Sequence, residues 1–252
     1  MKAILFDLDD TLVPERPALD AGYAAIAERV WGSGSGSPER VESLREAARA
    51  VWLDGRPTAY CLRVHFSLGE ALHGEFVAAG PEADELRAFV PELHARAFDA
   101  VLPPAWHGRS PELVDVWRAA RMAALAPYDE AVAVLERWAA RMPVALVTNG
   151  AVRLQRAKLT ATGIEDRFAA VIVSEEIGIG KPEPEPFQAA LAALGGLAPD
   201  EVVMVGNDAD RDVAGARAAG IRPIWLDRGW PAPEPAAERI ADLRELEGLL
   251  LG

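Results

Sequence analysis

Five short apolar runs have the pattern of strands that are buried on both faces. Continuous apolar runs of this length, without polar residues at alternate positions, are typical of the parallel strands inside an α/β protein. The runs lie at residues 3–6, 144–147, 170–173, 202–205 and 223–226. We therefore predict that these five segments are strands of one parallel sheet.

Helical patterns lie between the last four runs, at residues 151–162, 184–194 and 211–219, and another precedes the second run at 129–141. A regular alternation of strand and helix is typical of right-handed βαβ units in a doubly wound fold. The fold class predicted from this pattern is α/β, with a Rossmann-like core around the parallel sheet.

The first connection is far longer than the others. A βαβ unit needs only about 30 residues, yet the second apolar run begins at residue 144. Most of the intervening sequence is amphipathic and helical in pattern, with turn signals at 32–38 and 102–104. We predict an inserted all-α domain at residues 14–125, and a core formed by residues 1–13 and 126–252.

Composition limits the partners and the location. The chain of 252 residues has a formal net charge of −13 and contains one cysteine. An acidic surface repels nucleic acid and anionic membranes, and a single cysteine cannot form an internal disulfide, which suits a reducing compartment. The first apolar run is too short for a signal peptide. We expect a cytoplasmic protein with a small-molecule partner, no nucleic acid and no membrane; the sequence leaves a homodimer open.

Polar residues follow the predicted strands at the edge where open α/β sheets bind ligands. Several carboxylates at one edge would repel each other, and a divalent cation removes that repulsion; hard oxygen ligands suit Mg²⁺. Aspartate is also common in turns and helix caps, but clusters after two separate strands are harder to explain in that way. The residues concerned are Asp7, Asp9, Asp10, Thr148, Asn149, Asn207, Asp208, Asp210 and Asp212.

These residue types suit phosphoryl transfer. Asp7 and Asp9 share a face of an extended chain, so one carboxylate could attack phosphorus while the other handles a proton. Thr148 offers a hydroxyl near the N-terminus of a helix, where phosphate binds readily. Lys181 is one of only three lysines and would supply a positive point charge. All four histidines lie within residues 60–110, so chemistry in the core would not depend on histidine.

Taken together and in this order, the motifs resemble those of the haloacid dehalogenase-like (HAD) superfamily. The first motif corresponds to residues 7–11, the second to Thr148, the third to Lys181 in the frame of residues 178–187, and the fourth to residues 206–212. The resemblance implies a Rossmann-like core with a helical C1 cap inserted after the first motif. It implies that the cofactor is Mg²⁺.

The resemblance also assigns roles to individual residues. It implies Asp7 as the nucleophile and Asp9 as the general acid/base, with Thr148 and Lys181 completing the catalytic set. The predicted phosphate-binding residues are Thr148, Asn149 and Lys181. The predicted metal ligands are Asp7, the carbonyl of Asp9 and residues of the fourth motif, drawn from Asn207, Asp208 and Asp212.

The fourth motif departs from the family pattern at its start. The family usually has an aspartate where this chain has Asn207. An amide oxygen can still ligate Mg²⁺, but it brings less charge. Asp208, or Asp212 through a water molecule, could compensate, and which of the three contacts the ion is left open.

Residues 147–187 resemble most closely the branch that holds the pyrimidine 5′-nucleotidases and the N-acylneuraminate-9-phosphate phosphatases. The predicted function is therefore a magnesium-dependent phosphatase that hydrolyses a small nucleotide or sugar phosphate through an aspartyl-phosphate. The alternatives are a phosphomutase, a haloacid dehalogenase and, in another class, a non-catalytic binding protein on the same fold. Dehalogenases typically lack the second aspartate of the first motif, which this chain retains as Asp9, and retention of Lys181 disfavours a binding protein.

Overall fold

The structure of the chain is a computed structural model, which describes residues 1–232, 234 and 237–251. Its contacts divide the chain into two compact units. Unit 1 consists of residues 1–14 and 126–252, and unit 2 of residues 15–125.

Unit 1 contains one parallel sheet of six strands in the order β3-β2-β1-β4-β5-β6. The doubly wound α/β core predicted from the apolar runs is confirmed. β1 lies between β2 and β4, so its carboxyl end is flanked by the ends of two other strands. The strands are β1 (Ala3–Phe6), β2 (Val144–Thr148), β3 (Ala170–Val173), β4 (Val202–Gly206), β5 (Arg222–Leu226) and β6 (Glu238–Ile240).

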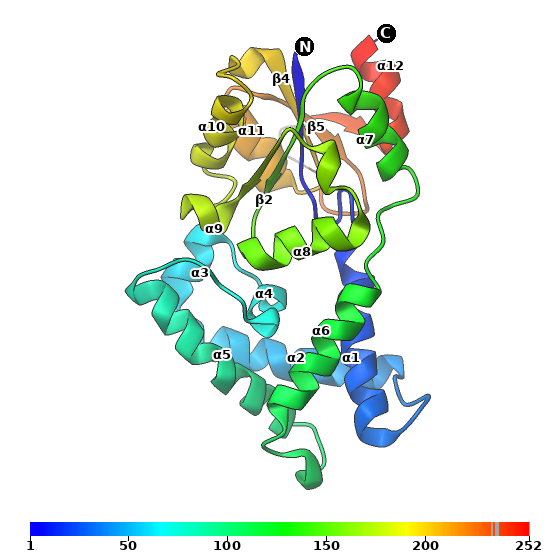
Figure 1. The fold of residues 1–252 in the computed structure, drawn as a ribbon, viewed down its shortest axis with the longest axis vertical. Helices are drawn as coiled ribbons and strands as arrows, with labels where there is room; N and C mark the ends of the chain where they lie inside the picture. Colours follow the sequence, from blue (N-terminus) through cyan, green and yellow to red (C-terminus); the bar gives the residue numbers. More distant parts are fainter. Residues whose placement is uncertain (233, 235–236, 252) are drawn as a thin grey trace. The chain divides into compact units, whose positions relative to one another are not determined.

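Helices cover both faces of this sheet. Figure 1 shows α10 (Pro184–Ala193) and α11 (Gly215–Ala218) on one side, and α7 (Ala131–Ala139) and α12 (Leu246–Leu251) on the other. On the α10 side, Phe187 packs against alternate residues of the strands, among them Leu5 and Met204. The other helical elements of unit 1 are α8 (Val152–Thr162), α9 (Ser174–Ile177), η2 (Glu165–Arg167), η3 (Pro199–Glu201), η4 (Ala209–Ala214) and η5 (Leu243–Glu245).

Among the elements of unit 1 that differ from the prediction are η4 and β6. The helix predicted at 211–219 begins earlier, as the wide π-type turn η4, because the Asp208 side chain accepts hydrogen bonds from the backbone N–H groups of Asp210 and Arg211. Strand β6 was not predicted. It has only three residues, of which Glu238 and Arg239 are exposed, so the sequence offers no apolar run there.

Every element of unit 2 is helical, in agreement with the all-α pattern. Its four long helices are α1 (Glu15–Trp31), α2 (Pro38–Gly55), α5 (Pro81–Asp99) and α6 (Ser110–Ala123). Three short elements complete it: α3 (Thr58–Val64), α4 (Leu68–His73) and η1 (Pro104–Trp106). α4 starts with a capping box, in which Ser67 and Glu70 satisfy each other's backbone N–H groups.

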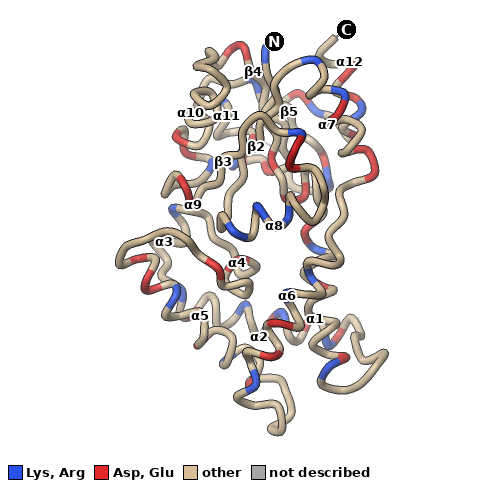
Figure 2. Tube along the Cα trace, viewed as in Figure 1, with Lys and Arg blue, Asp and Glu red and all other residues tan. Residues whose placement is uncertain are grey.

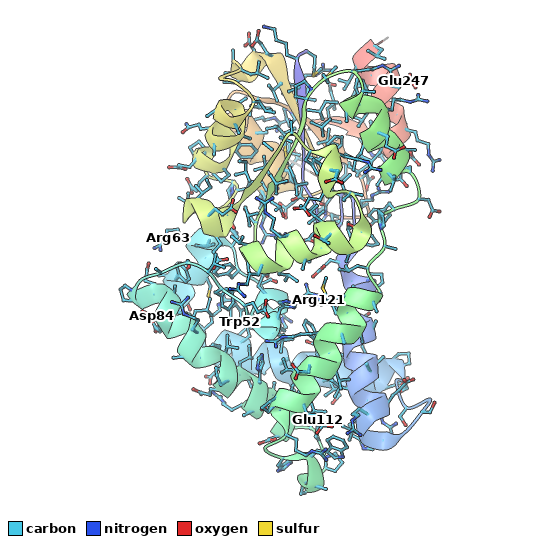
Figure 3. All side chains as sticks on the ribbon, viewed as in Figure 1. Trp52, Arg63, Asp84, Glu112, Arg121 and Glu247 are labelled. Carbon is cyan, nitrogen blue, oxygen red and sulfur yellow. The ribbon has the colours of Figure 1, made fainter. Side chains whose placement is uncertain are left out.

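The interior of unit 2 contains a buried arginine side chain. Arg121 on α6, labelled in Figure 3, is fully buried; it donates to the carbonyl of Gly69 at 2.8 Å and pairs with Glu15. Nearby, a side chain at Gly22 would collide with the ring of Trp117, which lies 2.6 Å from the position of an added Cβ. Close packing of α1 on α6 therefore requires glycine at this position.

None of the helices in the described residues has the length and apolar character needed to cross a membrane.

Candidate active site

Asp7 lies at the carboxyl end of the central strand β1. Its backbone N–H donates to the carbonyl of Val205 on β4, which extends the pairing of the two strands by one residue. The side chain is buried, and its Oδ1 accepts a hydrogen bond from Lys181 Nζ at 2.7 Å. The fold thus places Asp7 beside a lysine that is 174 positions away in the chain.

The same ammonium group also binds the fourth motif. Lys181 Nζ donates to Asp212 Oδ1 at 2.6 Å, and Asp212 Oδ2 accepts the backbone N–H of Asp208 at 3.0 Å. Asp212 lies so close to the end of β4 that a Cβ at Gly206 would be 2.2 Å from its Oδ2. Glycine is required at 206 because the carboxylate occupies the space of a side chain.

Burial and charge act together on these three groups. Burial raises the pKa of Asp7 to about 6, and the ammonium of Lys181 only partly opposes this shift. Burial likewise raises the pKa of Asp212, again against Lys181. Burial alone would lower the pKa of Lys181, but Asp212 and Asp7 outweigh it and the pKa is raised. Two buried carboxylates therefore share the single positive charge of Lys181, an arrangement that would be stabilised by another cation near Asp7.

The loop after β2 is tied to the loop that carries Lys181. Asn149 Oδ1 accepts the backbone N–H of Lys181, and Asn149 Nδ2 donates to the Lys181 carbonyl, both at 2.8 Å. Both hydrogen-bonding groups of this amide are engaged with the backbone. The Asn149 side chain therefore links the two loops. Thr148, the residue before it, is buried at the end of β2.

Two residues that the sequence reasoning did not single out contact Asp9. Lys158 Nζ donates to Asp9 Oδ1 at 2.7 Å, and Gln155 Nε2 donates to Asp9 Oδ2 at 3.0 Å. Gln155 Nε2 also lies 2.6 Å from Thr148 Oγ1. One signal was available in the sequence, because Lys158 is one of only three lysines in a chain rich in arginine.

Asn207 is buried beside the backbone of the first motif. Its backbone N–H donates to Thr11 Oγ1 at 3.1 Å. With the side-chain amide in one orientation, Asn207 Oδ1 accepts a hydrogen bond from the Thr11 hydroxyl at 2.8 Å. With the amide turned over, the nitrogen lies 3.1 Å from the carbonyl oxygen of Asp9, and the oxygen accepts from the indole of Trp230 at 3.2 Å. The Asn207 amide and the Asp9 carbonyl are therefore neighbours.

The other candidate ligands of the fourth motif have protein partners. Asp208 uses Oδ1 to cap the turn η4 and lies 3.7 Å from the guanidinium of Arg211 through Oδ2. Asp212 is engaged through both oxygens, as described above. Among the described residues, no cluster of three or more His, Cys, Asp or Glu side chains is arranged to hold a metal ion. A cation at this edge would thus require carbonyl, amide or water oxygens as well.

Comparisons with known proteins identify the family of the chain. The family model of the haloacid dehalogenase-like hydrolases matches residues 1–220. The chain therefore belongs to this family, and it is an enzyme of the hydrolase class. This result confirms the resemblance found in the four motifs.

Individual relatives include several phosphatases. The chain is 38% identical to a phosphoserine phosphatase from Thermus thermophilus, over 98% of each chain. It is 34% identical to a pyrimidine 5′-nucleotidase from Escherichia coli over 49% of this chain and 56% of that protein, and 28% identical to an N-acylneuraminate-9-phosphatase from Mus musculus over 47% and 48%. The last two belong to the predicted branch.

Among solved structures, a 2-haloacid dehalogenase from Pseudomonas syringae is 27% identical, with a TM-score of 0.63, and the match covers 100% of this chain and 98% of that one. The fold is thus shared by phosphatases and dehalogenases. Fold alone does not decide between these two activities, so the distinction depends on the residues of the site.

Proposed function

We propose that the chain is a magnesium-dependent phosphatase that hydrolyses a small phosphate monoester through an aspartyl-phosphate on Asp7. The observation that carries this proposal is the placement of a buried carboxylate nucleophile against the ammonium of Lys181, with Asp9 two residues further along. A lysine in that position would offset the negative charge of a bound phosphoryl group, so that a carboxylate could approach phosphorus.

The reaction would proceed in two displacements. An oxygen of Asp7 attacks phosphorus, the bond from phosphorus to the ester oxygen breaks, and the leaving alkoxide takes a proton from the carboxyl group of Asp9. Asp9 then accepts a proton from a water molecule whose oxygen attacks the phosphorus of the aspartyl-phosphate. The bond between Asp7 and phosphorus breaks, and inorganic phosphate leaves with both carboxyl groups back in their starting states.

The residues present fit a magnesium ion. Its proposed ligands are the carboxylate of Asp7, the carbonyl oxygen of Asp9 and the amide oxygen of Asn207, which are hard oxygen donors of the kind Mg²⁺ binds. With the amide in the orientation that accepts from the Thr11 hydroxyl, its oxygen takes the position that lies 3.1 Å from the Asp9 carbonyl oxygen, so one ion could contact both oxygens. We place Asp208 and Asp212 outside the direct ligand set because their oxygens have protein partners. When bound, the ion would offset phosphate charge and orient the phosphoryl group.

The substrate class rests on the relatives and on the presence of Asp9. The names of the relatives include phosphoserine and a pyrimidine nucleotide as substrates, so small phosphate monoesters are the class proposed for this chain. Asp9 favours a phosphatase over a dehalogenase because release of halide needs no proton donor for an alkoxide. We further propose that unit 2 is a C1 cap. A homodimer and a cytoplasmic location stay predictions.

A panel assay tests this proposal. Purified protein with Mg²⁺ is incubated with an aryl phosphate, phosphoserine, nucleoside monophosphates and sugar phosphates, and release of inorganic phosphate is measured. We expect turnover of at least one of these esters, and loss of that turnover in excess chelator with recovery on adding Mg²⁺. A 2-haloacid in the same buffer serves as the comparison. Halide release without phosphate release would overturn the proposal in favour of a dehalogenase.

A further inference from the structure

Both oxygens of the Asp9 carboxylate are held from one helix. Lys158 donates to Oδ1 and Gln155 to Oδ2, at 2.7 and 3.0 Å. The two residues are three positions apart on α8, which places them on the same face of the helix. A single rigid element thus contacts each oxygen of this carboxylate with a separate donor.

The burial of Lys158 is unusual for a lysine. Figure 2 shows a concentration of Lys and Arg on α8. Of these cations, Arg153 is exposed and Arg156 is half-buried, with Glu165 and Glu176 as its partners, whereas the side chain of Lys158 is fully buried. A buried ammonium group is costly unless it is paired. Solvation of the helix surface therefore does not account for Lys158, and its contact with Asp9 requires an explanation.

The three lysines of this chain fall into two groups, two that contact aspartates of the first motif and one at the surface. Lys181 contacts Asp7 and Lys158 contacts Asp9, so two of the three lysines each hold one aspartate of the first motif. The third, Lys2, is largely exposed and pairs with Glu201 at the surface. Gln155 connects the two halves of the site because its Nε2 also contacts Thr148 Oγ1 and the carbonyl of Asn149.

We infer that Lys158 and Gln155 are positioning residues that fix the plane and direction of the Asp9 carboxylate for proton transfer to the leaving group. This inference rests on the proposed function. The terminal torsion of an aspartate is broad, so an untethered carboxylate rotates freely. Proton transfer, in contrast, needs the carboxyl oxygen within hydrogen-bond reach of the ester oxygen. Two donors on one helix remove the rotation that would take Asp9 out of reach.

The consequence is a dependence on the leaving group. An aryl oxygen with strongly withdrawing substituents departs without a proton, whereas an alkyl oxygen departs only if Asp9 protonates it. A variant in which Asp9 is misplaced should therefore be impaired mainly toward esters with basic leaving groups. A residue that merely stabilised the fold would instead reduce activity toward all esters by the same factor.

The experiment measures kcat/KM for a series of esters, from p-nitrophenyl phosphate through phenyl phosphate to an alkyl phosphate. For Lys158→Met, we expect little loss with p-nitrophenyl phosphate and a loss of about 10²-fold with the alkyl ester, as for a misplacement of about 1 Å. Asp9→Asn should show the same trend more strongly. Gln155→Met should show it more weakly, and it introduces no unpaired charge. Lys2→Met is the matched control and should follow wild type throughout.

The outcomes separate this inference from the proposed function. One outcome is that wild type turns over the esters, but Lys158→Met and Gln155→Met lose kcat/KM by the same factor for every ester. This outcome would overturn the positioning role and leave the proposed phosphatase activity standing. Absence of turnover by wild type for every ester would overturn both. Thermal unfolding of each variant shows whether it is folded. If Lys158→Met does not fold, Gln155→Met decides the question by the same comparison.

Discussion

Lys181 and Asp212 form a buried ion pair with a distance of 2.6 Å between Nζ and Oδ1. Lys181 lies in the loop before α10 and Asp212 lies in η4, 31 positions further along the chain. Because Asp212 also accepts the N–H of Asp208, its carboxylate is fixed at both oxygens. Asp212 therefore orients the Lys181 ammonium that faces Asp7. This role does not require Asp212 to contact a metal ion.

Replacement of Asp212 by Asn should separate these two roles. Lys181 would lose one of its two anionic partners and its fixed direction, so we expect kcat to fall by up to about 10²-fold. The Mg²⁺ concentration for half-maximal activity should stay at the wild-type value. A metal titration at saturating substrate measures both quantities. A large increase in the Mg²⁺ requirement would instead show that Asp212 belongs to the ion's ligand shell.

Asp7→Asn should abolish turnover, because an amide is a poor nucleophile. The variant should remain folded, since the side chain keeps its size and burial. Phosphate release and mass spectrometry of the quenched protein provide the measurements, with an added phosphoryl group expected on wild type only. Asp200→Asn, at an exposed position of unit 1, is the control and should retain full activity. Retention of more than a small fraction of activity by Asp7→Asn would contradict the covalent route.

His94 should make the stability of the chain depend on pH. Burial lowers the pKa of His94 to about 4, and the nearby Arg118 adds to this shift. Its Nε2 lies 3.1 Å from the carbonyl of Leu72, so this nitrogen carries the proton in the neutral ring. Between pH 4 and the ordinary pKa of 6.5, the unfolded chain binds a proton that the folded chain does not. Stability should therefore fall as the pH is lowered through this window.

At about 1.4 kcal/mol per pKa unit, the contribution of His94 would amount to at most ~3 kcal/mol of unfolding free energy. The measurement is denaturant unfolding at pH 7 and pH 4.5, for wild type and for His94→Gln. Glutamine keeps an N–H donor for the Leu72 carbonyl but does not titrate. The difference between the two proteins should shrink at the lower pH. Parallel pH profiles would show that His94 does not contribute.

The sequence was sufficient for the five predicted strands because these strands are mostly apolar, and β1, β2 and β4 are buried at every position. It was insufficient for β6, where Glu238 and Arg239 are exposed and only pairing with β5 defines the strand. Asp7 and Lys181 could be assigned to one site from the sequence because they lie in ordered motifs that resemble those of the HAD superfamily.

The contacts of side chains within the site could not be derived in this way. Lys158 and Gln155 lie on a helix, and a linear sequence does not show toward which strand end a given face of that helix points. Asp212 was expected among the possible metal ligands, since spacing alone cannot distinguish a carboxylate that faces an ion from one that faces Lys181. Both questions depend on directions in space, which the structure supplies.

Asn207 provides the most direct test of the proposed metal site. Asn207→Asp adds a negative charge beside the Asp9 carbonyl, so Mg²⁺ should bind more tightly and the concentration for half-maximal activity should fall. Asn207→Ala removes the oxygen donor, and that concentration should rise. Asp208→Asn is the neighbouring control: its side chain caps η4, so it should alter stability without changing the metal requirement.

Thermal unfolding in the presence of Mg²⁺ is a second test of Asn207 as a metal ligand. In the orientation that places its nitrogen 3.1 Å from the Asp9 carbonyl, the Asn207 amide donates a hydrogen bond to that oxygen, whereas a carboxylate at this position would repel it unless a cation lay between them. Addition of Mg²⁺ should therefore raise the thermal unfolding temperature of Asn207→Asp more than that of wild type. If the activity titrations of wild type, Asn207→Asp and Asn207→Ala superimpose and Mg²⁺ raises their unfolding temperatures equally, Asn207 is not a ligand. The missing charge would then have to come from Asp208 or Asp212.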